Sequence, residues 1–310
     1  MARFLVTGGA GFIGSSLVRR LLKDDAQVRV VDDFSTGLRE NLEEVKDRIE
    51  LIEGDLADMA VAQRALGGID YVLHQAAIPS VPRSIQDPAS SNRANITATL
   101  NLLLAARDAG VKRFVFASSS SVYGDAEALP KVETMRENPI SPYALTKFTG
   151  EKYCLMFHRL YGLPTVALRY FNVFGPRQNP NSQYSGVISR FVSAALGGSQ
   201  PKVFGDGEQS RDFTYIDNVV SANLLSCQAA GVEGQVFNVG AGERHSLNKL
   251  LEVLGSIVGK ELVPEYAPPR AGDVRHSQAD IERARRLLEY QPQIGFQEGL
   301  RRTVAWFRKA

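Results

Sequence analysis

The sequence has few of the features that mark secreted, membrane-bound or metal-binding proteins. Its two cysteines, Cys154 and Cys227, lie far apart, which excludes a disulfide framework and fits a reducing compartment. It contains no uninterrupted run of about 20 apolar residues. The apolar Phe4 to Val6 follows Met1 too closely for a charged leader and a long hydrophobic segment. We therefore expect a cytoplasmic protein that does not bind membranes.

An excess of charge of either sign is also lacking. The 36 Lys and Arg residues nearly balance the 34 Asp and Glu residues, and the formal net charge is +2. This composition gives no reason to expect nucleic acid or an anionic membrane as a partner, and the basic run Arg283 to Arg286 is interpreted as the solvated face of a helix. The four histidines show no close pairing with other ligand types, so no structural metal site is expected.

What the sequence does contain is an alternation of short apolar runs with helical patterns. A chain of 310 residues, with 44% apolar and 23% charged residues, is long enough for a large core and fits an ordinary enzyme. The apolar runs predict buried parallel strands with helices on both faces, which is an α/β fold with a doubly wound (Rossmann) sheet. The strands are expected at 3–7, 27–31, 49–53, 71–74, 114–118 and 165–170.

The pattern changes after Asn172, where segments rich in Gly, Pro and Asn predict loops rather than regular βα units. A helical pattern resumes at 213–230 and a further strand is expected at 236–240, so this segment is predicted to rejoin the sheet. A loop is expected at 264–273, and helices at 281–289 and 297–308. We therefore assign 1–171, rejoined by about 213–240, to a Rossmann domain, and 172–212 with 241–310 to a smaller mixed α/β substrate region.

A glycine-rich turn follows the first strand and opens a helix expected at 15–22. Its spacing is Gly8-x-x-Gly11-x-x-Gly14, with Phe12 and Ile13 before the last glycine. Glycines let the backbone approach a pyrophosphate, and the unpaired N–H groups and dipole of a helix N-terminus attract it. Taken alone the glycines could form a mere turn, but the strand before them and the helix after them favour a dinucleotide site.

Acidic and small residues after the later strands complete the expected cofactor site. Asp32 ends the second strand, where a carboxylate accepts hydrogen bonds from the adenosine ribose and repels a 2′-phosphate. Asp33 follows without an adjacent arginine, which favours NAD over NADP. Asp55 and Leu56 are candidates to meet the adenine, with a helix N-cap role for Asp55 equally open. Further cofactor contacts are expected from Ser35, Thr36, Gly37, Gln75, Ala76, Ala77 and Tyr170.

The stretch from Ala117 to Lys147 brings hydroxyls, a phenol and an ammonium into one short span. If Pro142 marks the first turn of a helix, Tyr143 and Lys147 lie on one face as neighbours. An ammonium favours a nearby phenolate, so we expect Lys147 to lower the pKa of Tyr143 from about 10 toward working pH. The Tyr-x-x-x-Lys spacing also arises by chance, and the pair gains meaning only beside a cofactor and substrate site.

The order of these motifs resembles the extended short-chain dehydrogenase/reductase family over essentially the full chain. The segments 118–124 (SSSSVYG) and 168–175 (LRYFNVFG) are similar to those of the UDP-sugar 4-epimerases. The resemblance implies NAD-dependent C4 epimerisation of UDP-hexoses through a transient 4-keto sugar. It implies Ser119 as the catalytic hydroxyl, Tyr143 as the acid/base, and Lys147 as the residue that holds the NAD ribose and assists the tyrosine. Because serines adjoin Ser119, the alternatives Ser118 and Ser120 stay open, and Ser120 is also expected beside the sugar.

The resemblance also implies where the UDP-sugar binds. The matching positions are Asn172, Val187, Val203, Phe204, Arg211, Arg270 and Asp273, and two arginines suit a diphosphate because guanidinium binds phosphate oxygens bidentately. Pro79 replaces a lysine of many galactose-type epimerases, and Ser277 replaces a tyrosine of UDP-glucose-restricted members. These departures are similar to the UDP-GlcNAc/UDP-GalNAc 4-epimerases. They imply activity on those N-acetylated sugars, with UDP-glucose and UDP-galactose also accepted. A homodimer is implied through helices near 92–109 and 143–161.

Two other functions stay open. One is a sibling enzyme, either a nucleotide-sugar 4,6-dehydratase or a UDP-glucuronate-processing enzyme. Dehydratases typically carry an acidic pair after the catalytic hydroxyl, whereas serines follow Ser119; for glucuronate, Arg83 or His276 could contact the carboxylate. The other is a sensing protein that binds NAD and a nucleotide sugar without turnover. Such members usually lose the Tyr/Lys pair that this chain keeps.

Overall fold

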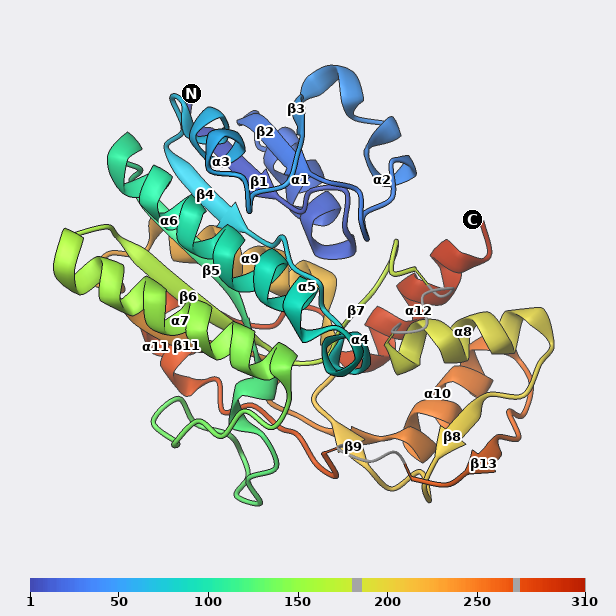
Figure 1. Ribbon diagram of the computed structural model, residues 1–310. Helices are drawn as coiled ribbons and strands as arrows, with labels where there is room; N and C mark the ends of the chain where they lie inside the picture. The colour runs from blue at the N-terminus through green and yellow to red at the C-terminus, as the bar shows by residue number, and fades with distance from the viewer. Residues whose placement is uncertain (180–185, 270–273, 310) are drawn as a thin grey trace.

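A parallel sheet of seven strands organises the computed structural model, which describes residues 1–179, 186–269 and 274–309 (Figure 1). The strand order is β11-β6-β5-β4-β1-β2-β3, and each neighbouring pair is parallel. This confirms the expected α/β doubly wound fold. The strands are β1 (Arg3–Thr7), β2 (Gln27–Asp32), β3 (Glu50–Glu53), β4 (Tyr71–His74), β5 (Arg113–Ser119), β6 (Thr165–Tyr170) and β11 (Gln235–Val239).

Helices cover both faces of the sheet, which explains why its strands are apolar on both sides. Leu5 and Val6, neighbours in β1, enter different hydrophobic clusters because successive side chains of a strand point to opposite faces. One cluster packs the sheet against α3 (Met59–Leu66), α6 (Ala98–Ala109) and α7 (Pro142–Tyr161). The other packs it against α1 (Phe12–Lys23), α9 (Ile216–Gln228) and α11 (Glu282–Leu288).

The helix expected at 92–109 is present but changes its winding along its length. It begins as α5 (Pro88–Asn92), passes through a π-helical turn at Arg93–Thr97 and continues as α6 to Gly110, whose φ of 65° ends it. Asn95 in the π turn accepts a hydrogen bond from Ile78 N (2.8 Å) and donates one to Thr146 Oγ1 (2.9 Å). The side chain thus ties this helix both to the chain after β4 and to α7.

The region after β6 is more regular than the sequence predicts. It contains β7 (Val173–Phe174), α8 (Val187–Gly197), β8 (Lys202–Phe204), β9 (Ser210–Arg211) and β10 (Thr214–Tyr215) before α9, and β12 (His245–Ser246), α10 (Leu247–Val258), β13 (Glu265–Ala267) and α12 (Phe296–Phe307) after β11. No helix was expected at α8, and the prediction of a loop at 264–273 was wrong at β13. β13 exists because it pairs with β8, about sixty residues earlier, and such pairing leaves no local signal.

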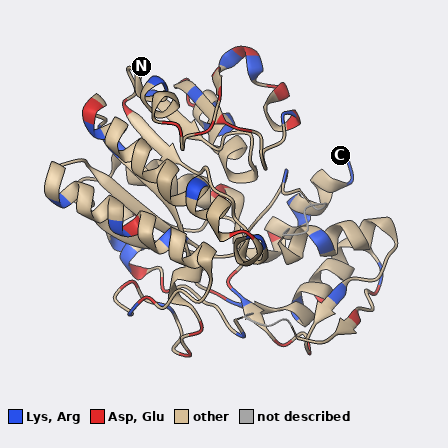
Figure 2. Cartoon of the chain, in the orientation of Figure 1, with Lys and Arg blue, Asp and Glu red and all other residues tan. Residues whose placement is uncertain are grey.

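The distribution of charged residues agrees with the balanced composition. Figure 2 shows Lys and Arg interspersed with Asp and Glu over both parts of the molecule. Within the residues that the structure describes, no helix is long and apolar enough to cross a membrane.

Short helices α2 (Glu40–Glu43) and α4 (Val81–Gln86) follow β2 and β4 and stand at the ends of the strands that carry the candidate site.

Candidate active site

A cavity of about 710 Å³ runs along the carboxyl ends of the central strands. The loops that follow β1 to β5 line it on one side, and residues after β6 line it on the other. In doubly wound sheets a ligand binds where the strand order reverses, which here is between β1 and β4. Of the residues expected to bind the cofactor, all but Lys147 line this cavity.

The glycine turn is shaped by contacts that admit no side chain. Gly8 has a φ of +64°, and a Cβ there would lie 2.8 Å from the backbone of Ala76. A Cβ on Gly14 would lie 2.1 Å from the carbonyl oxygen of Gly8. Gly11 is the N-cap of α1 and offers no side chain to the first N–H groups of the helix, which leaves them to an anion. The turn thus meets the needs of a pyrophosphate cradle.

Gly14→Ala is expected to weaken NAD binding at least tenfold, because the new Cβ must push the turn away from the helix N-terminus. The measurement is the NAD content of the purified protein and its affinity by calorimetry. Gly197→Ala is the matched control, since a Cβ at Gly197 near the end of α8 meets nothing within 4 Å. Equal NAD affinity in Gly14→Ala and wild type would remove the turn from the cofactor site.

The acidic residues of the cofactor side are held by backbone N–H groups. Asp32 accepts hydrogen bonds from Ala10 N (2.8 Å) and Phe34 N (2.9 Å), yet burial raises the pKa of its carboxyl group. Its carboxylate is therefore ordered at the end of β2 and borders the cavity.

Asp55 is not the N-cap of α3, so that alternative was wrong. The cap is Asp58, whose side chain accepts from Ala60 N, because α3 begins three residues further along than the acid-Leu pair suggested. Asp55 instead accepts from Ala57 N (2.8 Å) and pairs with Arg93 at 2.7 Å. It lines the cavity and stays a predicted adenine contact.

The floor of the cavity carries a small polar group around Tyr170. Its hydroxyl accepts a hydrogen bond from Asn223 Nδ2 (2.8 Å) and lies 3.2 Å from Gln75 Oε1. Burial raises the pKa of Tyr170, so this phenol stays protonated. Tyr170 and Gln75 therefore present fixed hydrogen-bonding groups, which suits binding and does not suit proton transfer.

Tyr143 and Ser119 meet at the centre of the cavity wall. As expected, α7 begins at Pro142, and the N-cap Ser141 accepts a hydrogen bond from Ala144 N (3.1 Å). This start puts Tyr143 in the first turn, where its phenol lies beside the Ser119 side chain, which lowers the pKa of that phenol. A substrate hydroxyl placed between these two groups would contact one proton acceptor and one donor.

The expected effect of Lys147 on Tyr143 was wrong for the protein alone. Burial raises the pKa of Tyr143 to about 12, and the hydrogen bond from Ser119 offsets only part of that rise. Burial also lowers the pKa of Lys147 to about 8, and its Nζ donates to Ala117 O (2.8 Å) rather than to the phenol. Desolvation is the largest cause of both pKa shifts, because an interior site disfavours either charge.

The structure separates the members of the serine run. Ser118 also lines the cavity, but it is buried and its hydroxyl donates to Glu151 Oε2 (2.8 Å). Ser121 donates to Ser119 Oγ at 2.9 Å, and Ser120 is half-buried and lines the cavity. Ser119 is thus the serine in contact with Tyr143, and Ser118 is engaged elsewhere.

The structure places only some of the expected substrate-binding residues at the cavity. Ser120, Asn172, Arg211 and Ser277 line the cavity, as do Pro79 and Arg83. Val187, Val203 and Phe204 are not among its described lining residues, and Val203 is completely buried, so their contacts with uridine stay predictions. Arg270 and Asp273 lie outside the described residues.

Asp212 ties the substrate wall together. Its carboxylate accepts hydrogen bonds from Ala241 N (2.7 Å), Gly242 N (3.0 Å) and Ala279 N (3.1 Å). Its own carbonyl accepts from Asn172 Nδ2 (3.2 Å). One buried side chain thus joins three segments that flank the substrate side of the cavity.

Two buried residues near the site were missed by sequence reasoning. Lys131 lines the cavity and donates to Ala126 O, but its place depends on a bridge to Ala279 far along the chain, which no local pattern announces. Glu151 is different. It follows Tyr143 and Lys147 at four-residue intervals on α7, and that spacing could have identified it.

Known proteins are similar to this chain in sequence and fold over nearly its whole length. The family model described as NAD dependent epimerase/dehydratase family matches residues 4–240. The UDP-glucose 4-epimerase of Mycolicibacterium smegmatis is 43% identical over 310 residues, which cover 99% of this chain and 98% of that protein.

Two solved structures are similar in the same way. The UDP-N-acetylglucosamine 4-epimerase from Methanobrevibacter ruminantium, in complex with UDP-N-acetylmuramic acid, has a TM-score of 0.95 and 42% identity, covering 99% of this chain and 98% of that one. The UDP-glucose 4-epimerase of Thermus thermophilus, in complex with NAD, has a TM-score of 0.90 and 38% identity, covering 99% of each chain.

Proposed function

The chain belongs to the NAD-dependent epimerase/dehydratase family, and we propose that it inverts C4 of UDP-hexoses through a transient 4-keto sugar. The N-acetylated pair UDP-GlcNAc and UDP-GalNAc is the proposed principal substrate, with UDP-glucose and UDP-galactose also accepted. One observation carries the proposal. The neighbouring side chains of Ser119 and Tyr143 line the same cavity as the glycine turn and Asp32, so an acid/base group and a dinucleotide site share one space.

NAD is the cofactor, and the residues of the chain fit it. Gly8 and Gly14 form a cradle that any Cβ would fill, and the carboxylate of Asp32 at the end of β2 suits a ribose without a 2′-phosphate. Bound in this cradle, NAD would supply the hydride acceptor and donor for C4 of the sugar. Because the net redox change is zero, the cofactor is expected to stay bound.

The chain supplies the proton chemistry. Tyr143 Oη removes the proton of the C4 hydroxyl and returns it after inversion, while the Ser119 hydroxyl donates to the same sugar oxygen and orients it. The pKa of Tyr143 is about 12 in the protein alone, so its phenolate needs a cation nearby. Lys147, one helical turn away and charged below its pKa of about 8, is the proposed source.

The sugar preference rests on two small residues at the cavity. Ser277 donates its backbone N–H to Ser210 O (3.0 Å), which holds the segment beside Arg211. A serine at this position leaves volume that a tyrosine would fill, and a 2-N-acetyl group needs such volume. Pro79, also on the wall, places no cation at the sugar. Arg211 and Asn172 are proposed to hold the diphosphate, together with Arg270 and Asp273.

Incubation of the enzyme with UDP-GlcNAc, followed by NMR of the product, tests this function. We expect UDP-GalNAc to form without added reductant. A stable 4-keto-6-deoxy sugar would indicate dehydration, and intact NAD binding without turnover would indicate sensing. A parallel incubation with UDP-glucuronate tests the remaining sibling activity. If UDP-glucose were converted while UDP-GlcNAc was inert, the argument from Ser277 would be wrong.

We also propose a homodimer through α6 and α7. The outer face of α7 exposes Leu145, Met156, Leu160 and Tyr161, a larger apolar group than a solvated helix needs. Light scattering at micromolar concentration is expected to give roughly twice the 33.9 kDa of one chain. Leu160→Glu should shift the mass toward the monomer, whereas Val263→Glu, exposed elsewhere, should not. A wild-type monomer under these conditions would overturn the proposed assembly.

A further inference from the structure

Three successive residues at the end of β5 each meet a different turn of α7. Ala117 O accepts from Lys147 Nζ (2.8 Å), Ser118 Oγ donates to Glu151 Oε2 (2.8 Å), and the Ser119 side chain lies beside Tyr143. Since 143, 147 and 151 lie on one face of the helix, these contacts form a ladder between strand and helix. Two of its rungs hold the proposed catalytic groups, and the third holds Glu151.

Glu151 is a fully buried carboxylate with a matching cation. Arg169 donates from Nε to Glu151 Oε2 (3.0 Å) and from Nη2 to Glu151 Oε1 (2.5 Å). Ser118 and Arg169 are direct partners in the register of β5 and β6, so both reach Glu151 from the same face of the sheet. Glu151 is thereby fixed in direction as well as in position.

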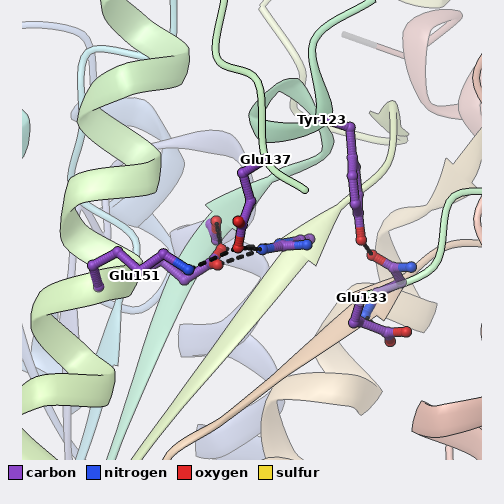
Figure 3. Close-up of polar contacts among 8 residues, drawn as sticks. Tyr123, Glu133, Glu137 and Glu151 are labelled. Carbon is purple, nitrogen blue, oxygen red and sulfur yellow. Dashed lines mark hydrogen bonds and ion pairs between the residues drawn. The ribbon is translucent and has the colours of Figure 1, made fainter. Parts of the chain in front are cut away.

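Other groups fix Arg169 in turn. Its Nη2 also donates to Glu137 Oε1 (2.8 Å), and its guanidinium lies 4.7 Å from the ring centre of Tyr123. Figure 3 shows Glu137 and Glu151 close together, with Tyr123 and Glu133 apart from them. Lys152 bonds Glu137 from the half-exposed edge of α7 (2.7 Å) and is the outermost member. The inner part of the network is therefore rigid and desolvated.

Stability alone does not account for such a pair. Replacing a buried ion pair by apolar side chains of similar volume is often neutral or stabilising, because removing two charges from water is costly. Apolar side chains, unlike an ion pair, form no directional hydrogen bonds. Methionines would let α7 slide or rotate against β5 by a fraction of a turn, whereas a carboxylate bound by three donors permits one arrangement.

We propose that Glu151, oriented by Arg169 and joined to Ser118, is a positioning residue that sets the register of α7 on β5 and thereby places Tyr143 and Lys147 against Ser119 and Ala117. The inference rests on the proposed function, because Tyr143 and Lys147 are the groups that it positions. It assigns to the pair a role in turnover that is separable from its role in folding.

The experiment compares Ser118→Ala, the double variant Glu151→Met/Arg169→Met, and Lys152→Met as matched control, each as the NAD-loaded enzyme. Ser118→Ala keeps the ion pair and removes only its link to β5. The double variant removes the pair without leaving a buried charge alone, so it is expected to fold. Lys152→Met alters the outer edge of the same helix and leaves Glu151 with its partners. For each protein, Tm, kcat and KM are measured with UDP-GlcNAc and UDP-glucose.

We expect the double variant to keep Tm within a few degrees and KM within about threefold, while kcat falls about 100-fold, as a misplacement of about 1 Å can cause. Ser118→Ala should lower kcat about tenfold at unchanged KM. Lys152→Met should behave as wild type. A double variant that keeps the wild-type kcat as well as the wild-type Tm would overturn the proposal, since the pair would then have no role in turnover.

A second readout does not depend on substrate. In a crystal structure of the double variant, Lys147 Nζ should have left Ala117 O and Tyr143 should have lost Ser119, whereas Lys152→Met should keep both contacts. Both contacts retained in the double variant would contradict the positioning role even if kcat had fallen. A wild-type enzyme that converts no UDP-hexose would refute the proposed function, and the crystallographic comparison would still decide the inference.

Discussion

Tyr143→Phe is expected to lower kcat by about 10³-fold, because the substitution removes the only atom of this side chain that can exchange a proton with the C4 hydroxyl. The ring itself should stay in place, since α7 is capped by Ser141 and anchored by Lys147 at Ala117 O (2.8 Å). NAD content and KM should therefore change little. The measurement is steady-state kinetics with UDP-GlcNAc alongside the bound NAD per protein chain.

A matched variant separates loss of the catalytic hydroxyl from loss of a tyrosine in general. Tyr161→Phe removes the hydroxyl of the last, exposed residue of the same helix and should leave kcat unaltered. Normal turnover by Tyr143→Phe would exclude Tyr143 from the mechanism. Loss of NAD in that variant would instead indicate that the phenol serves cofactor binding.

The second large effect concerns the sugar. Ser277→Tyr is expected to lower kcat/KM for UDP-GlcNAc by about 100-fold, which corresponds to about 3 kcal/mol, while UDP-glucose loses less than about fivefold. The reason is steric, because a phenol at Ser277 would enter the cavity that this residue lines and compete with the N-acetyl group. The ratio of the two kcat/KM values in one preparation measures the effect.

The control for this variant is Ser256→Tyr, which adds the same ring at an exposed position of α10 and should leave the ratio at its wild-type value. Equal losses on both sugars in Ser277→Tyr would count against a steric gate and favour a general disturbance of the substrate wall. That wall is held together by Asp212, so the Tm of each variant is measured in parallel.

Local sequence patterns were sufficient to predict the part of the fold in which strands and helices alternate to form the parallel sheet. The strands at 3–7, 71–74 and 165–170 agree with β1, β4 and β6, because a buried parallel strand needs a continuous apolar run. The start of α7 at Pro142 and the end of α6 at Gly110 each follow from the backbone geometry of a single residue. The same holds for the glycine turn, whose close contacts with Ala76 and Gly8 depend on the absence of side chains.

Local patterns failed where a strand or side chain is placed by a partner far along the chain. β13 forms only on β8, and Lys131 reaches the cavity only through its bridge to Ala279. The pKa of Tyr143 was misjudged for a related reason. The four-residue spacing predicts the approach of Lys147, but the extent of burial, which raises the pKa to about 12, depends on everything packed around the pair.

The sequence by itself thus determined the doubly wound sheet, the glycine turn with Asp32, and the helical face that carries Tyr143 and Lys147, because each depends on residues close together in the chain. Only the tertiary structure decided which serine meets Tyr143, that Ser118 bonds to Glu151, and that Arg169 binds Glu151 from the neighbouring strand. Those contacts join β5, β6 and α7, and their geometry follows from strand register and packing, which no short segment encodes.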